Sequence, residues 1–238
     1  MAVVVRAEGV RKAYRNGSTV EALAGVDVQI RPGELLAVIG PSGSGKTTLL
    51  NCLSGLEPVD EGRVTVEGED LHGLSDDERT DWRARRMGFV FQAFNLLPVL
   101  SAVENVEVPL LLTGARHRDV RRRAMEMLGA VGLSHRADHR PNQLSGGEQQ
   151  RVTVARALVH EPAVVWADEP TGNLDSETGQ QIVGLFTEMT SRGRTVVLVT
   201  HDAALAERAD RTIRMRDGRI EVADDTSARL GSAVAGQV

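Results

Sequence analysis

Cysteine and aromatic residues are scarce in this sequence. Its 238 residues include one cysteine, Cys52, and aromatic residues make up 3% of the chain. One cysteine excludes an internal disulfide and a cysteine-based zinc cluster, and it fits a protein of a reducing compartment. We expect Cys52 to be a small buried apolar residue. Because aromatic side chains are few, a core built from the 41% of hydrophobic residues must consist mainly of Val, Leu, Ala and Ile.

Long hydrophobic runs are also missing. The longest, LLAVI at 35–39 and LLPVL at 96–100, fall well short of the ~20 apolar residues that span a bilayer. The start, MAVVVRAEGV, lacks the charged leader and long apolar stretch of a signal peptide. The net charge of -5 argues against nucleic-acid binding over the whole surface. We therefore expect a soluble chain that takes any membrane role through a partner.

Short β-branched runs alternate with longer helical patterns, which is typical of an α/β fold with a mostly parallel sheet. The runs LLAVI, VVWA and VVLV are continuously apolar, as strands buried on both faces should be. The first two and the last two predicted strands alternate in polarity or adjoin turns, so we expect them to be antiparallel and partly exposed. The predicted strands cover residues 3–7, 26–30, 35–39, 63–66, 88–91, 163–167, 195–200, 212–215 and 219–222.

Strand signals vanish between Gln92 and Pro162, which predicts a helical insert between two sheet-forming halves. We expect one domain over 1–222, followed by a loose tail rich in Ala, Gly and Ser over 223–238. The domain would divide into a core of about 1–92 and 162–222 and a helical subdomain of about 93–161. The predicted helices cover residues 46–55, 76–86, 118–131, 146–160, 176–192 and 203–209.

Residues 40–47, GPSGSGKT, match the phosphate-binding pattern G-x-x-x-x-G-K-[ST] between an apolar strand and a helix, the context that the pattern requires. Its glycines permit φ values closed to other residues, so that backbone N–H groups and the helix dipole face phosphate oxygens. Lys46 would reach the β- and γ-phosphates, Thr47 would ligate Mg²⁺, and Thr48 would bind the α-phosphate. The loop therefore predicts binding of ATP and Mg²⁺. The predicted ATP site comprises Gly40, Pro41, Ser42, Gly43, Ser44, Gly45, Lys46, Thr47 and Thr48.

A second pattern, AVVWADEP at 163–170, ends an apolar strand in two carboxylates. In proteins with a phosphate loop an Asp at this point holds Mg²⁺, usually through water, and we assign that role to Asp168. Glu169 follows on the side that can face the γ-phosphate, where a carboxylate can orient or deprotonate the attacking water. The alternative is a solvated acidic turn before a proline. We expect Trp166 to pack in the core.

A second glycine cluster, QLSGGEQQRVTVARAL at 143–158, places Ser145, Gly146 and Gly147 at the head of a helix. Such a helix N-terminus binds anions. A chain with one phosphate loop has no obvious use for a second site about 100 residues away. We therefore expect this cluster to act on a nucleotide held by another subunit.

The segment LSGGEQQR resembles the signature motif of ATP-binding cassette proteins, and the chain from about 3 to 222 resembles the cassette of ABC transporters. The resemblance implies a nucleotide-binding core with a mostly parallel sheet, an N-terminal antiparallel β-subdomain and an inserted helical subdomain. It also implies a homodimer that closes head-to-tail around two ATP molecules. Competent turnover would then require the dimer. The resemblance also implies that the dimer associates with a transmembrane permease on the cytoplasmic side of the cell membrane.

The same resemblance assigns roles to three separate residues. Tyr14, in RKAYRNG, corresponds to the aromatic residue that stacks on adenine. Gln92, at the end of MGFVFQ, corresponds to the glutamine that contacts Mg²⁺ or water and senses the permease. His201, in LVTHD, corresponds to the histidine that holds the γ-phosphate. Taken singly, these residues would be surface packing, a strand-end residue and a helix cap.

Three further roles lie at the seam between two cassettes. The resemblance implies that Ser145 and Gly147 contact the γ-phosphate in the opposite subunit's site and that Asp175, in GNLD, lines the dimer seam. Glu148 stands where many cassettes have Gln, and the stretch before Asp175 begins Gly-Asn rather than Ser-Ala. With FNLLPVLSAVENVEVPLL, these features resemble the branch of lipoprotein-release, macrolide-export and cell-division cassettes.

The leading hypothesis is an ATPase subunit that powers a permease, with export or membrane extraction of a lipoprotein, peptide or drug-like cargo. The alternative is a cassette that drives a non-transport partner, such as a regulator of cell division or of a cell-wall hydrolase. Cassettes of translation and DNA repair generally carry paired cassettes or long coiled coils, and neither is present. A nucleotide kinase would leave LSGGEQQR unexplained.

Three groups of residues have both a functional and a structural interpretation. The apolar stretch after Gln92 forms either part of a groove for a permease helix or the core of the insert. The basic stretch 116–123 faces either lipid headgroups or solvent. The histidines outside the predicted site are expected at the surface. The members of the apolar stretch are Phe94, Leu96, Leu97, Leu100 and Val106, and the remaining histidines are His72, His117, His135, His139 and His160.

Overall fold

The computed structural model describes residues 2–16 and 18–225. Its contacts divide the chain into two compact units, Met1–Ser75 with Phe186–Val238 and Asp76–Leu185. The second unit includes the whole predicted insert, 93–161, and one strand on either side of it. Among the described residues, no helix combines the length and the apolar character that crossing a bilayer requires.

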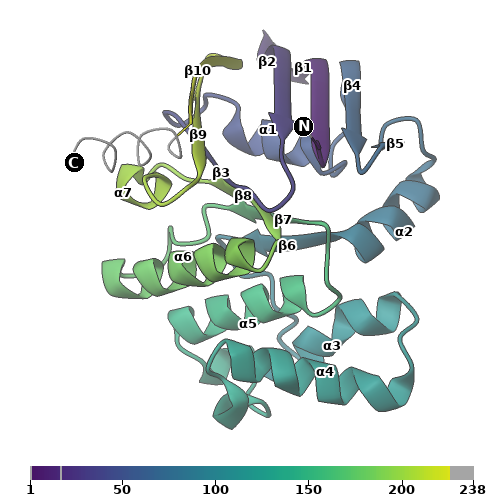
Figure 1. Cartoon of the computed structure of the whole chain (residues 1–238), viewed down its shortest axis with the longest axis vertical. Helices are drawn as coiled ribbons and strands as arrows, with labels where there is room; N and C mark the ends of the chain where they lie inside the picture. Colours follow the sequence, from purple (N-terminus) through teal and green to yellow (C-terminus); the bar gives the residue numbers. More distant parts are fainter. Residues whose placement is uncertain (1, 17, 226–238) are drawn as a thin grey trace, which may run out of the picture. The chain divides into compact units, whose positions relative to one another are not determined.

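The first unit contains an antiparallel sheet with the strand order β2-β1-β4-β5 (Figure 1). Its first two strands are 12 and 13 residues long, far beyond the predicted 3–7 and 26–30. Their register shifts at several points, first between Ala7 and Val10, and such irregularities break the two-residue alternation by which a strand is recognised in a sequence. The strands are β1 (Val5–Asn16), β2 (Ser18–Ile30), β4 (Glu61–Val66) and β5 (Glu69–Asp70).

The same unit contains strands in the order β10-β9-β3-β8. Strand β3 pairs in parallel with β8 and β9, whereas β10 pairs antiparallel with β9. The last two strands are thus antiparallel to each other as expected, but β9 also joins the parallel part of the sheet. These strands are β3 (Leu35–Ile39), β8 (Thr195–Val199), β9 (Arg211–Arg216) and β10 (Arg219–Asp225), and the helices of the unit are α1 (Lys46–Leu53) and α7 (Ala203–Ala206).

Strand β10 ends at Asp225, three residues beyond its predicted end at Val222. The rest of the predicted tail, 226–238, lies outside the described residues.

The second unit combines two parallel strands, β6 and β7, with helices, of which α3, α4 and α5 pack together (Figure 1). Helix α2 has the predicted bounds, whereas α3 was missing from the predicted helices. It begins at a capping box, in which the Ser101 hydroxyl accepts from the Glu104 amide, but Pro109 interrupts its helical pattern. The elements are α2 (Asp76–Arg86), β6 (Met87–Phe91), α3 (Ala102–Leu112), α4 (His117–Ala130), η1 (Ser134–Arg136), η2 (Pro141–Gln143), α5 (Gly146–Leu158), β7 (Val164–Asp168) and α6 (Ser176–Ser191), which ends in the first unit.

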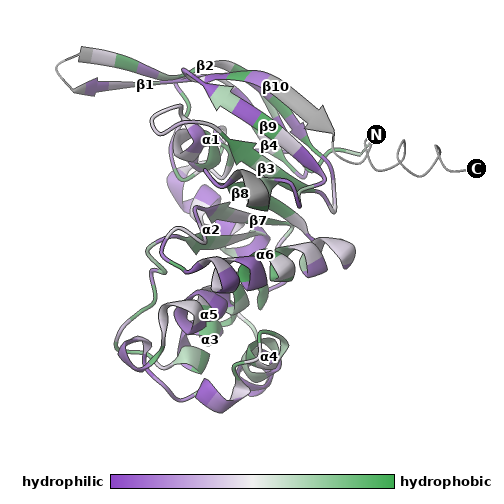
Figure 2. Cartoon of the chain, turned by 90° about the vertical axis from the view of Figure 1, so that its left-hand side faces the viewer, coloured by the Kyte–Doolittle hydropathy of each residue, from purple (hydrophilic) through white to green (hydrophobic). Residues whose placement is uncertain are grey.

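The core of each unit is built from its continuously apolar strands. All of β8 and the first four residues of β3 are buried, and Figure 2 shows β3 in the green of hydrophobic residues. Trp166 of β7 is fully buried, so its expected core packing is confirmed. Cys52 of α1 is also buried, and burial raises the pKa of its thiol to about 12. It is therefore a protonated apolar side chain, as expected.

Candidate functional site

The predicted phosphate loop connects β3 to α1 in the first unit. Its glycines have positive φ values of 153° at Gly40, 78° at Gly43 and 98° at Gly45. A Cβ atom at Gly40 would lie 2.2 Å from the carbonyl oxygen of Met215, and one at Gly45 would lie 2.4 Å from that of Ala22. A side chain at either position would have to displace the backbone of β9 or β2. The packing of the unit therefore fixes the loop before any ligand binds.

Helix α1 leaves its N-terminus open to an anion. No side chain of the described residues caps it, and its first turn carries no acidic residue. Helices α3 and α5, in contrast, begin with complete capping boxes. The first N–H groups of α1 lack intrahelical partners, and the positive end of the helix dipole lies beside them. This helix start is thus suited to bind phosphate oxygens.

Lys46 is folded into its own loop. It is 8% exposed, and its Nζ donates hydrogen bonds to the carbonyl oxygens of Gly40, at 3.0 Å, and Pro41, at 2.9 Å. The Oγ atom of Ser44 is buried as well and has no hydrogen-bond partner among the described residues. A buried ammonium and an unpaired hydroxyl beside an uncapped helix fit a triphosphate. Thr47 is exposed on the next position, and its hydroxyl is an oxygen ligand of the kind that Mg²⁺ prefers.

Tyr14 lies on β1 of the same unit and is 38% exposed. Its hydroxyl donates a hydrogen bond to the Glu57 carboxylate and lies 3.5 Å from Oγ1 of Thr48 on α1. The Nζ atom of Lys12 lies 5.9 Å from the centre of the ring. Burial and the hydrogen bond to Glu57 raise the pKa of the Tyr14 hydroxyl, so it remains a donor. The hydroxyl of this exposed ring is therefore held by Glu57 and lies close to α1, the helix that follows the phosphate loop.

His201 follows strand β8, which pairs in parallel with β3. The amide of Thr200 donates to the carbonyl of Val38 at 3.1 Å, so His201 and the phosphate loop follow neighbouring strands at one edge of the sheet. The next residue, Asp202, accepts a hydrogen bond from the Leu205 amide at the start of α7. His201 is exposed.

In the second unit, Gln92 and the acidic pair follow the parallel strands β6 and β7. Phe91 is in register with Asp168, so Gln92 and Glu169 are the next residues of neighbouring strands. Glu169 has a φ of 47°, a left-handed conformation that non-glycine residues adopt rarely. Its carbonyl accepts from the amide of Gly172 at 3.1 Å. Glu169 is half-buried, unlike a residue of a fully solvated acidic turn.

Gln92 has a partner that the sequence did not reveal. Its Nε2 donates to Oδ1 of Asn173 at 3.2 Å, and Nδ2 of Asn173 donates back to the carbonyl of Gln92 at 2.9 Å. A Cβ atom at Gly172 would lie 2.8 Å from the same Nε2. The Gly-Asn pair, which departs from the family pattern, thus fits the position of Gln92. Reciprocal amide contacts across 81 residues leave no local signal in a sequence.

Ser145 caps α5. Its Oγ accepts from the Glu148 amide at 3.2 Å, and the Glu148 carboxylate accepts from the Ser145 amide at 2.8 Å and from Nε of Arg136 at 3.0 Å. The Ser145 backbone amide, with Arg136 adding to its effect, holds the pKa of Glu148 below its usual range.

Gly147 and Asp175 meet at Thr178. A Cβ atom at Gly147 would lie 2.4 Å from the Thr178 methyl carbon, so only glycine fits there without a shift. The Asp175 carboxylate accepts hydrogen bonds from the Thr178 amide at 2.9 Å and from the Thr178 hydroxyl at 2.7 Å. The hydrogen bond from the amide is the main cause that lowers the pKa of Asp175. Asp175 thus stabilises the start of α6, and the signature glycine packs against that same turn.

Gln150 is a site residue that the sequence analysis missed. It is fully buried, and its Nε2 donates to the carbonyls of Pro170, at 2.6 Å, and Phe91, at 3.4 Å. The signature helix is thereby joined to the ends of β6 and β7, where Gln92 and Glu169 lie. Its place in LSGGEQQR was the available signal, because a buried glutamine in a helix must find polar partners.

Residues 23–172 match the family model described as ABC transporter, which covers more than half of the chain. The chain belongs to the ABC transporter family. Over 222 residues the cassette is 48% identical to an uncharacterized ABC transporter ATP-binding protein of Thermotoga maritima, covering 93% of this chain and 95% of that protein. It is 44% identical to the lipoprotein-releasing system ATP-binding protein LolD of Bacteroides fragilis, covering 91% of this chain and 100% of that protein.

A longer relative contains the cassette as one part. The macrolide export ATP-binding/permease protein MacB of Brucella melitensis is 47% identical over 96% of this chain, which spans 35% of its length. Among solved structures, the dimeric post-hydrolysis state of the cassette MJ0796 bound to ADP and Pi matches with a TM-score of 0.87 and 42% identity, covering 93% of this chain and 98% of that one. The expected family, branch and α/β cassette fold are confirmed. The protein is an ATPase, the ATP-binding subunit of an ABC transporter of the LolD and MacB type.

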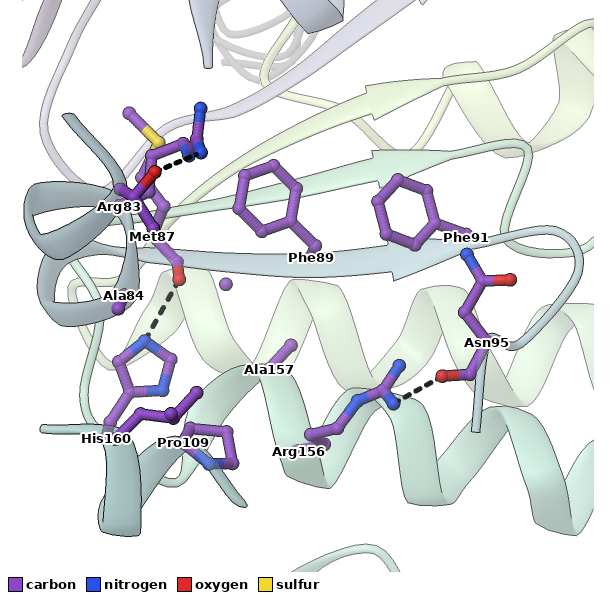
Figure 3. A pocket seen from close by; sticks show the side chains of 13 residues that line it. Arg83, Ala84, Met87, Phe89, Phe91, Asn95, Pro109, Arg156, Ala157 and His160 are labelled. Atoms are coloured by element: carbon purple, nitrogen blue, oxygen red, sulfur yellow. Dashed lines mark hydrogen bonds between the residues drawn. The ribbon is translucent and has the colours of Figure 1, made fainter. Parts of the chain in front are cut away.

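The second unit of the cassette also contains a cavity of about 370 Å³ that opens beside β6 (Figure 3). Phe89 and Phe91 lie side by side along it, with ring centres 5.8 Å apart. Nε2 of His160 contacts the Met87 carbonyl at 3.0 Å, and burial lowers the pKa of this half-buried histidine. The expectation of surface histidines is confirmed for His117 and His135, whereas His72, His139 and His160 are half-buried. The cavity lining includes Phe89, Phe91, Pro109, Leu112, Arg156 and His160.

The apolar stretch after Gln92 is partly buried and partly exposed. Val106 is fully buried on α3 and belongs to the core of the insert, whereas Leu97 is 45% exposed. Before Leu97, Phe94 and Asn95 have positive φ values of 59° and 51°.

The basic stretch on α4 is paired with acidic partners. Arg121 contacts Glu107 at 3.2 Å and Asp138 at 3.1 Å, and Arg122 contacts Glu126 at 2.9 Å and Asp119 at 3.4 Å. This pairing favours the solvated helix face over a lipid-facing one.

Proposed function

We propose that this cassette hydrolyses ATP as a head-to-tail homodimer and thereby drives a separate transmembrane permease from the cytoplasmic side of the cell membrane. The preorganised phosphate loop carries the proposal, because its packed glycines, enclosed ammonium and uncapped helix leave a site for a triphosphate. Residues 1–222 would act as one domain, with a core of about 1–92 and 162–222 and a helical subdomain of about 93–161.

Binding of ATP would be shared among residues of the loop and β1. Lys46 exchanges its bonds to the loop carbonyls for the β- and γ-phosphates, and Thr48 donates to the α-phosphate. Tyr14 offers its exposed ring to the adenine. Thr47, Asp168 and Gln92 would hold Mg²⁺ directly or through water. When bound, Mg²⁺ neutralises phosphate charge.

Hydrolysis would depend on Glu169, which orients or deprotonates the attacking water. Its left-handed backbone supports this role, because such strain persists where the surrounding structure requires one position of the side chain. His201 would hold the γ-phosphate, and Gln92, steadied by Asn173, would report the state of the permease.

The homodimer would complete each site with residues of the other copy. Ser145 and Gly147 lie at the head of α5 and would contact the γ-phosphate bound to the partner, while Asp175 would line the seam between copies. Support comes from the dimeric structure of the MJ0796 cassette at 42% identity.

The cavity beside β6 is the proposed docking groove for a cytoplasmic helix of the permease. Its apolar walls, Phe89, Phe91 and Leu112, match a helix with an apolar face, and Leu112 is 72% exposed. MacB is named as an ATP-binding/permease protein and is about three times as long as this chain. The cargo would be a lipoprotein, peptide or drug-like molecule that is exported or extracted from the membrane. A permease that binds the cassette without moving cargo would indicate a role in regulating cell division or a cell-wall hydrolase.

The test is Glu169→Gln. We expect this variant to bind ATP and to dimerise with it, while turnover falls by about 10²–10⁴-fold, the range for loss of a general base. ATP titration, light scattering and phosphate release measure the three properties. Glu69→Gln removes an exposed carboxylate on β5 and should leave all three unchanged. Turnover at the wild-type rate in Glu169→Gln would refute the assignment of the base.

A further inference from the structure

We propose that Glu57 is a positioning residue for nucleotide binding. Its carboxylate, anchored on the phosphate-loop helix, holds the ring of Tyr14 ready to stack on the base. The inference rests on the proposed function, which assigns Tyr14 to adenine.

A short chain of hydrogen bonds connects the ring to the helix. The Tyr14 hydroxyl donates to one oxygen of Glu57, and Nδ2 of Asn51 on α1 donates to the other at 3.0 Å. The backbone is fixed as well, since the amides of Leu56 and Glu57 donate to the Asn51 carbonyl at 2.9 Å and 3.2 Å. Oγ1 of Thr48, one helical turn before Asn51, lies 3.5 Å from the hydroxyl. Tyr14 is thus tied to the helix whose N-terminus would bind the phosphates.

This attachment explains how an exposed ring can be a binding surface. Tyr14 is 38% exposed and lies on a hairpin strand, so packing alone does not immobilise it. A ring that must be ordered when the ligand arrives costs about two- to tenfold in affinity. Holding the hydroxyl beforehand removes that cost and sets the spacing between base and phosphate contacts.

A positioning role of Glu57 and a purely electrostatic effect of its charge predict opposite changes in ATP affinity. Glu57 is an anion in the unit that binds an anionic ligand, and like charges repel. If its charge were its only influence, Glu57→Ala would strengthen binding of every phosphate ligand. Positioning predicts the opposite for ATP and no loss for a ligand without a base.

The experiment compares ATP with inorganic tripolyphosphate, each with Mg²⁺, by calorimetric titration of the full chain. We expect Glu57→Ala and Tyr14→Phe each to weaken ATP binding about three- to tenfold, because both free the ring. The double variant should lose no more than either single one, since both remove the same bond. Tripolyphosphate should bind at least as tightly as to wild type. Glu57→Gln keeps an acceptor for the hydroxyl and should retain most of the affinity for ATP.

Kinetics and two controls complete the design. The KM for ATP should rise in Glu57→Ala while kcat stays within about twofold, since the interaction affects binding rather than the reaction. Glu69→Ala, an exposed carboxylate on β5, should change neither ligand's affinity. Equal losses for ATP and tripolyphosphate, additive losses in the double variant, or unchanged ATP affinity in Glu57→Ala would overturn the proposal.

Tyr14→Ala separates this inference from the function on which it rests. Tyr14→Ala could weaken the binding of ATP but not of tripolyphosphate, while Glu57→Ala changes the affinity for neither ligand. In that case Tyr14 binds the base and Glu57 does not position it. If Tyr14→Ala leaves ATP affinity unchanged, the assignment of Tyr14 to adenine fails, and the role of Glu57 fails with it.

Discussion

Glu148 stabilises the head of α5 as a charged group. Its carboxylate accepts hydrogen bonds from the Ser145 amide and from Arg136. The pKa of Glu148 lies below its usual range chiefly because of the hydrogen bond from the Ser145 amide. A carboxyl whose folded pKa is depressed adds stability above its unfolded pKa, about 4.3, and loses it as the pH falls through the folded value. We expect Glu148→Gln, which keeps an acceptor but not the charge, to be less stable at pH 7 by about 0.5–1 kcal/mol. The gap should close below about pH 4.

Urea unfolding of both proteins between pH 7 and the acid limit measures this difference. Glu69→Gln, exposed on β5, is the matched control, and its stability should follow the wild type at every pH. A gap between wild type and Glu148→Gln that stays constant with pH would show that the charge is not the cause.

At the scale of elements, α5 holds the segment that follows β6. The Arg156 guanidinium donates to the carbonyl of Asn95 at 2.6 Å (Figure 3). It also donates to the carbonyl of Phe94 at 3.0 Å, and both acceptor residues have left-handed backbones. Burial lowers the pKa of Arg156, which reflects the cost of its desolvation. Two charge-assisted bonds offset this cost and the strain in the segment. Helix α5 thus connects the signature motif at its start with the proposed docking groove near its end.

Arg156→Ala should lower the free energy of unfolding by about 2–4 kcal/mol, because two charge-assisted hydrogen bonds are lost. The backbone amides of residues 94–97 should then exchange their hydrogens faster. Adding Asn95→Gly, which tolerates a positive φ, should recover about 1 kcal/mol. Urea unfolding and exchange mass spectrometry measure both. Unchanged exchange at 94–97 in Arg156→Ala would mean that the segment is held by other contacts.

Elements with a strong local pattern could be predicted from the sequence, and those with a broken pattern could not. LLAVI and VVLV identify β3 and β8 because burial on both faces leaves an uninterrupted apolar run. The long hairpin of β1 and β2 escaped because bulges disrupt its alternation, and α3 escaped because Pro109 lies inside it. In the site, the loop and the acidic strand end are local motifs. The partners Asn173, Gln150 and Glu57 contact their targets across long stretches of chain, where spacing carries no signal.

The molecule as a whole is proposed to work only in pairs, with each ATP between the phosphate loop of one copy and the Ser145 cap of the other. This arrangement predicts complementation between inactive proteins. Lys46→Ala removes the ammonium group that would bind the phosphates. Ser145→Arg places a bulky side chain at the N-terminus of α5. Each variant alone should form dimers with two defective sites.

In the mixed dimer, one site combines the intact Lys46 of one copy with the intact Ser145 of the other. An equimolar mixture should therefore recover about a quarter of wild-type turnover, because half of the dimers are mixed and one of their two sites is whole. Phosphate release from the mixture measures this recovery, and Glu169→Gln in place of Ser145→Arg is the control. That pairing should stay inactive if Glu169 acts beside the Lys46 of its own chain, since the only site with Lys46 then lacks the base. No recovery in the test mixture would contradict the shared site, and recovery in the control would show that Glu169 acts on the ATP held by the other subunit.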